Sequence, residues 1–142
     1  MTTNEAKHKL ALHIITHLAN QKTRAHKDGN CLYRTEDDLR CAAGCTIPDG
    51  AYTAGMEGNS VPDILEKSEA YRNHLLEEFG LHPEEALPIL QGLQNIHDTR
   101  RVEDWPVAIY GFMLGYFDSI YHANSADRTF YNAGWKLEAN NV

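Results

Sequence analysis

The sequence predicts a mainly α-helical domain of about five helices around one core, covering residues 1–142 as a single domain. Apolar residues recur at three- and four-residue spacing in four stretches, and helix-start signals precede three of them. Between residues 28 and 58 this spacing is lost, so an irregular, loop-rich segment with a short hairpin is expected there. Apolar residues at 42% and charged residues at 23% are ordinary for a globular chain of this length.

The first expected helix covers residues 5–21. Its buried stripe is predicted to contain Leu10, Ala11, Ile14, Ile15 and Leu18. His13 and His17 lie four residues apart at the edge of this stripe, a spacing at which two imidazoles can bind one metal ion. Because no carboxylate or thiol lies near them in the segment, they are expected to be boundary residues of an amphipathic helix.

Three turn signals punctuate the irregular segment, at Asp28-Gly29, Pro48-Asp49-Gly50 and Glu57-Gly58-Asn59. Residues 40–45 between them are expected to form a short helix, because the acids that precede them suit the positive end of a helix. The small residues at 42–44 would let another backbone approach closely. Long irregular segments in compact domains commonly carry function.

A second helix is expected from Ser60 to Gly80. Ser60 can cap its first turn, Pro62 fits that turn, and Gly80 fits its end. Its predicted buried residues are Ile64, Leu65, Tyr71, Leu75, Leu76 and Phe79.

A third helix is expected after Pro83, with acids in its first turn. Pro88 either starts this helix or bends it. Its predicted buried residues are Leu87, Leu90, Leu93 and Ile96.

A fourth helix, from about residue 104 to 121, is apolar on every side. Such a helix is either central to the core or half-covered by another subunit. Gly111 and Gly115 form a smooth strip for close packing, so a homodimer through residues 105–121 is expected. A short final helix is expected to dock through Phe130, Tyr131 and Trp135.

Charge and composition narrow the function classes. The net charge is −7, and residues 1–27 hold five Lys and Arg against one acid, whereas the rest holds eight against nineteen. Such an acidic chain is a poor general binder of nucleic acid, although the basic end leaves room for a local anion site. No apolar stretch is long enough to span a membrane, and no cofactor motif occurs.

The cysteines indicate the compartment. Cys31, Cys41 and Cys45 are an odd number, whereas secreted scaffolds usually carry an even set. The N-terminus also lacks a basic flank followed by an apolar run, so no secretory signal is expected. Reduced thiols and a cytoplasmic location are therefore predicted.

Several short segments carry a resemblance. They are Cys31-Leu32-Tyr33-Arg34, the Arg-Cys-Ala-Ala-Gly-Cys run at 40–45, Met56-Glu57-Gly58 and the Leu-Gln-Asn-Ile-His-Asp run at 93–98. Together they resemble a family of small phage, prophage and bacterial proteins. The resemblance covers residues 31–58 and 93–98, about a quarter of the chain. It implies a phage-related setting and supplies no reaction.

These segments favour recognition over catalysis. Aromatic faces, guanidinium forks and carboxylates can bind a host protein or a small phosphorylated metabolite. The candidate binding residues are Tyr33, Arg34, Arg40, Tyr52, Glu57, His97 and Asp98. The alternative for each arginine is an internal pair with a nearby acid. The leading hypothesis is a non-catalytic, phage-encoded binding protein, for example an inhibitor of host defence.

Two other functions remain open from the sequence. The first is a small hydrolase, in which Cys41 at a helix start acts with His97 and Asp98, or in which zinc is bound. The zinc ligands would be Cys31, Cys41, Cys45 and His97, although only one closely spaced thiol pair exists. The second is a structural module without any site.

Overall fold

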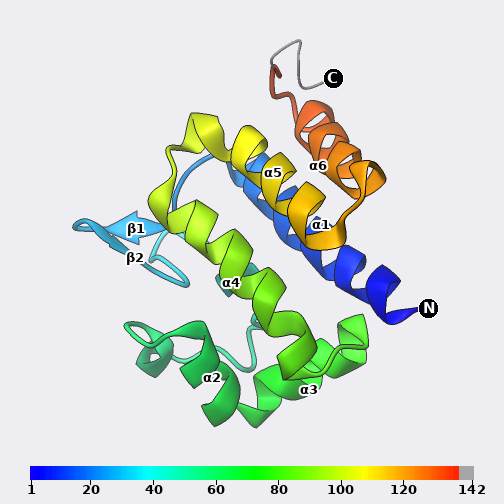
Figure 1. Ribbon diagram of the computed structural model, residues 1–142. Coiled ribbons are helices and arrows are strands. Elements are labelled where there is room, and N and C mark those ends of the chain that lie inside the picture. Colours follow the sequence, from blue (N-terminus) through cyan, green and yellow to red (C-terminus); the bar gives the residue numbers. More distant parts are fainter. Residues whose placement is uncertain (138–142) are drawn as a thin grey trace.

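The computed structural model describes residues 1–137 and shows the predicted mainly α-helical architecture. Residues 138–142, the end of the predicted single domain, lie outside this description. The helices are α1 (Thr3–Gln21), α2 (Val61–Lys67), α3 (Glu69–Phe79), α4 (Pro83–Thr99), α5 (Trp105–Phe117) and α6 (Ile120–Asn132). Helix α1 packs against α4 and α6, and α5 packs against both of these as well (Figure 1). Helices α2 and α3 gather at one end of this bundle (Figure 1).

One contiguous hydrophobic cluster lies between these helices. The stripe predicted for α1 is entirely buried, as are Ile64, Leu65, Tyr71, Leu75 and Phe79 from α2 and α3. The prediction for Leu76 was wrong, because this side chain is 45% exposed on the outer side of α3. From α4, Leu90, Leu93 and Ile96 are buried, and Leu87 is partly buried against the cluster. No helix within residues 1–137 combines the length and hydropathy needed to cross a bilayer.

The region from 60 to 80 forms two helices where one was predicted. Ser60 caps α2 as expected, accepting a hydrogen bond from the backbone N–H of Asp63 at 3.3 Å. At Ser68 the backbone becomes extended (φ −106°, ψ 99°), and the Ser68 hydroxyl accepts from the N–H of Tyr71 at 3.1 Å. A second serine cap thus starts a new helix in the middle of an apolar pattern that continues through residues 60–80.

Helix α4 begins at Pro83, as predicted, so Pro88 lies in its interior and does not start it. The limits of α5 and α6 differ from the prediction. Helix α5 ends at Phe117 because Asp118 adopts a left-handed conformation (φ 50°), and Ser119 then caps α6. Helix α6 is thirteen residues long and buries Phe130, while Tyr131 is 70% exposed and does not dock.

The irregular segment contains the expected hairpin at its start. Strand β1 (His26–Lys27) pairs antiparallel with β2 (Asn30–Cys31) around Asp28-Gly29. Both turn residues have positive φ, 53° for Asp28 and 82° for Gly29, as a type I′ hairpin turn requires. A second tight turn follows, closed by an isolated antiparallel β-bridge between Arg34 and Arg40. We call residues 33–41 the acidic turn.

The expected helix at 40–45 is absent, and only a 3-10 turn at Gly44–Thr46 forms there. The prediction of a close backbone approach was correct. A side chain at Gly44 would collide with the backbone of Tyr33, so no other residue fits without a shift of the chain. This contact seats the 3-10 turn directly against the acidic turn.

Candidate functional site

Glu57 organises the irregular segment. Its carboxylate accepts hydrogen bonds from the backbone N–H groups of Tyr33 (2.9 Å) and Arg34 (3.1 Å) and from the hydroxyl of Tyr52 (2.7 Å). Bonds to a charged acceptor are roughly twice as strong as neutral ones. The Tyr33 hydroxyl in turn donates to the carbonyl of Asn59 at 2.6 Å. The structure therefore brings four of the predicted binding residues together, around the Glu57 carboxylate.

The Arg34 side chain is directed into the protein and is only 13% exposed. Nη1 donates to Oδ1 of Asp49 at 2.8 Å, and Nη2 donates to the carbonyl of Ile47. The guanidinium carbon lies 4.7 Å from the centre of the Tyr52 ring, which adds a cation–π contact. A ligand would have to displace these partners, so Arg34 supports the segment and offers no free guanidinium fork.

Arg40 lies across the acidic turn from Arg34 and is 25% exposed. Nη2 of Arg40 is 3.2 Å from Oδ1 of Asp38 and 3.4 Å from Oδ1 of Asp49. These two carboxylates are 77% and 82% exposed, so they lie between the arginines and the solvent. Together with exposed Glu36 and Asp37 they make the outer surface of this region acidic.

Helix α1 holds the same segment from its inner side. Ring Nε2 atoms of His17 and His13 bind the carbonyls of Arg40 (3.0 Å) and Cys45 (3.2 Å). Gln21 accepts from the N–H of Arg40 and donates to its carbonyl, both at 2.9 Å. A carbonyl can only accept, so each histidine carries its proton on Nε2. The two histidines are therefore loop anchors at the boundary of α1.

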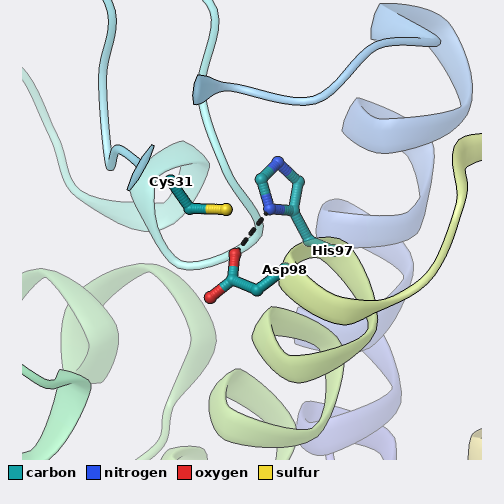
Figure 2. A group of neighbouring side chains, drawn as sticks. All are labelled: Cys31, His97 and Asp98. Atoms are coloured by element: carbon teal, nitrogen blue, oxygen red, sulfur yellow. Dashed lines mark hydrogen bonds and ion pairs between the residues drawn. The ribbon is translucent and has the colours of Figure 1, made fainter. Parts of the chain in front are cut away.

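His97 is completely buried near the end of α4, where its ring binds the backbone just before β1. Its Nε2 accepts a hydrogen bond from the backbone N–H of Ala25 at 3.1 Å, and its Nδ1 lies 2.8 Å from Oδ1 of Asp98. The ring stacks on Trp105, with ring centres 5.6 Å apart. Figure 2 shows Nδ1 facing the Asp98 carboxylate and Nε2 on the opposite edge of the ring.

The hydrogen-bond partners of His97 indicate which ring nitrogen carries the proton. Because Nε2 accepts from Ala25, the ring proton sits on Nδ1 and is donated to Asp98. Burial alone would raise the pKa of Asp98, but hydrogen bonds from His97 and Gln94 hold it below its usual value. Asp98 is therefore an ionised acceptor, and His97 has no lone pair left for a substrate proton.

The same assignment bears on metal binding. Within residues 1–137, Cys31, His97 and Asp98 form a group whose potential ligand atoms lie within 4.8 Å of one another (Figure 2). Neither Cys41 nor Cys45 belongs to it, so the predicted four-ligand zinc set does not assemble. A metal on Nδ1 of His97 would move the ring proton to Nε2, directly against the N–H of Ala25. The hydrogen bonding of His97 thus fits a structural role.

The thiols are also poor nucleophiles. Burial raises the pKa of Cys41 to about 12, and its sulfur accepts the N–H of Gly44 at 3.3 Å. Burial and the Asp98 carboxylate raise the pKa of Cys31 to about 11, and burial also raises the pKa of Cys45. Cys41 does not sit at a helix start. The predicted Cys41–His97–Asp98 hydrolase therefore lacks both a thiolate and an available base.

We expect the thiols of the folded protein to react slowly with iodoacetamide at pH 7.5. All three cysteines are free, and an elevated pKa leaves so little thiolate that alkylation should be roughly a hundredfold or more slower than for free cysteine. In denaturant, three alkylated cysteines should appear by mass spectrometry. A folded protein that loses one thiol at the rate of free cysteine would restore the nucleophile hypothesis.

Sequence reasoning missed Gln94 as the link between the two parts of the site. Its Oε1 accepts from the N–H of Ala43 at 2.9 Å, and its Nε2 donates to Oδ1 of Asp98 at 2.9 Å. It also missed Gln21 and the ion-pairing role of Asp49. The position of Gln94 one turn before Asp98 was the available signal, since side chains four apart on a helix meet.

No protein-family model, curated protein or solved structure matches the chain.

Proposed function

We propose that this chain is a non-catalytic binding protein that contacts a partner protein through the surface of residues 31–58. The proposal rests on the hydrogen bonds that fix the backbone of this segment, which has little regular secondary structure. Side chains of α1, α4 and the segment itself bind its backbone at Tyr33, Arg34, Arg40, Ala43 and Cys45. A loop ordered in advance loses little conformational entropy on binding, which favours affinity and specificity.

A protein partner fits this surface better than a phosphorylated metabolite does. Arg34 is engaged internally, and the surface around Arg40 carries Asp38 and Asp49. Carboxylates at that position would repel a phosphate at close range. A basic patch on another protein would be attracted by the exposed acids and steered toward the acidic turn.

The resemblance to small phage and prophage proteins suggests the setting. Within this proposal the protein is phage-encoded, acts in the host cytoplasm, and inhibits a host defence by occupying a host protein. The free thiols are compatible with a reducing compartment.

Site-specific photo-crosslinking in a bacterial host tests the proposal. A crosslinker in place of Glu36, which is 91% exposed on the acidic turn, should give one discrete protein adduct. The same crosslinker in place of exposed Glu77 on α3 should give none. The adduct should disappear on competition with untagged protein, and also when Asp37→Lys and Asp38→Asn are added to a chain that still melts normally. Equal adducts from both positions, or none from Glu36, would contradict the proposal.

We further propose that the chain forms a homodimer through the outer face of α5. Val107 is 55% and Leu114 is 39% exposed there, and a side chain at Gly111 or Gly115 would meet nothing within 4 Å. Residues 105–117 contain no charged side chain. Two copies related by a two-fold axis could set the leucine of one against the glycine strip of the other, which makes the face self-complementary.

The dimer proposal predicts that Leu114→Lys gives a folded monomer. The same change at Leu76, which is 45% exposed on α3, should leave a dimer. Met113 is unsuitable as a test site because it is completely buried, so a charge there would unfold the protein. Light scattering coupled to gel filtration measures the mass, and a thermal melt verifies folding. Unsubstituted protein that is monomeric at high concentration would rule out the dimer.

A further inference from the structure

A small polar pocket lies where the two parts of the candidate site meet. Its volume is about 240 Å³, and it is bounded by the end of β2 and the two residues after it, by residues 58–61 and by the last turns of α4. Cys31, Tyr33, Asn59, Gln94 and Asp98 contribute to its lining. Tyr33 and Asp98, predicted from separate sequence segments, thus line the same pocket.

The pocket carries a negative charge without a matching cation. Among the described residues Asp98 accepts hydrogen bonds from His97 and Gln94, but it forms no ion pair with a Lys or Arg. Burial, with additional contributions from Asp98, Glu57 and Asp63, raises the pKa of Tyr33. The nearby Arg24 charge slightly opposes the rise in the pKa of Cys31. The Arg24 guanidinium, however, donates to the backbone carbonyls of His97 and Arg100.

The size of the pocket limits what it can hold. At about 240 Å³ the pocket is smaller than a typical drug-sized ligand site, which begins near about 300 Å³. A nucleotide is therefore too large and carries the wrong charge, whereas one ammonium or guanidinium group with its aliphatic stem fits both constraints.

We infer that this pocket receives a cationic group, ammonium or guanidinium, which pairs with the Asp98 carboxylate. The inference rests on the proposed function in one respect, namely that the group is a Lys or Arg side chain of the partner protein. A free diamine is the other source of the same chemistry. The acidic turn would attract the basic partner, and the pocket would select one of its side chains.

The test uses amide shifts in NMR spectra of the full chain during titration with N-acetyl-lysine methylamide. The amides of Cys31, Tyr33, Asn59 and Asp98 should shift together and saturate at millimolar concentration. The matched neutral compound, N-acetyl-norleucine methylamide, should bind at least tenfold more weakly because it lacks the charge. A titration with 1,4-diaminobutane compares the free amine with the side chain.

Two variants locate the binding at Asp98. Asp98→Asn removes the charge while its amide oxygen can still accept from His97, and it should weaken lysine binding at least tenfold. Cys31→Met fills the pocket and leaves the His97–Asp98 pair untouched, and it should do the same. Thermal melts establish that each is folded. If Asp98→Asn fails to fold, Cys31→Met together with the neutral compound decides the question.

The possible outcomes separate this inference from the proposed function. Equal shifts with the lysine and norleucine compounds, absence of any shift, or unchanged binding in a folded variant would overturn the pocket inference. Lysine binding without any crosslinked partner would instead support the pocket inference and contradict the proposed partner protein. Tighter binding of the lysine compound than of the diamine supports a side chain as the source, and the reverse order supports a free amine.

Discussion

Replacement of His97 by alanine is expected to lower the free energy of unfolding by about 3–5 kcal/mol, the range for truncating a large buried side chain. The ring is completely buried, stacks on Trp105, and satisfies the backbone N–H of Ala25. Removing it leaves a cavity and an unsatisfied buried donor, and the donor alone costs about 1–3 kcal/mol. Chemical denaturation measures the loss.

The control for this prediction is His26→Ala in the neighbouring hairpin. His26 is exposed, and its ring Nδ1 lies 3.2 Å from the carbonyl of Arg24, two residues away in the chain. Its replacement should change the free energy of unfolding by less than about 0.5 kcal/mol. If His97→Ala unfolds at the same denaturant concentration as the unsubstituted protein, the histidine is not a structural clamp, and a functional role for it returns.

Replacement of Glu57 by alanine is expected to cost about 2–4 kcal/mol, because a single carboxylate serves the N–H groups of Tyr33 and Arg34 and the hydroxyl of Tyr52. Glu57→Gln should cost a similar amount, since one acceptor oxygen becomes an NH2 group that faces the backbone N–H of Tyr33 or of Arg34. Hydrogen exchange at the amides of Tyr33 and Arg34 should accelerate in both variants before global unfolding.

Glu36→Ala provides the matched control on the same segment. Glu36 is 91% exposed and its ion pair with Lys27 is 3.4 Å long, so its removal should cost well under about 1 kcal/mol. Glu57→Ala with unchanged denaturation and unchanged exchange at Tyr33 would show that the segment keeps its shape without Glu57. Glu57 would then not preorganise residues 31–58, contrary to the proposed binding surface.

The helical class could be predicted from the sequence because its signals are local. The apolar stripe of α1, the Ser60 cap and the Asp28-Gly29 turn each depend on residues within a few positions of one another. Local signals failed where two were in competition. A serine cap at Ser68 interrupted an apolar pattern that continued, and the left-handed Asp118 ended α5 before its apolar residues did.

The roles of the candidate site residues depended on partners distant in the chain. Ala25 and His97 are 72 residues apart, and Tyr33 and Glu57 are 24 apart, so no local pattern could pair them. From the sequence, Arg34 and His97 were candidates for binding a ligand, and the fold gave both internal partners. Chemistry of this kind depends on which lone pairs and charges remain unsatisfied after folding, and only the tertiary structure decides that. The sequence by itself determined which groups were present, and packing left Asp98, not the arginines, as the charge that faces a pocket without a cation.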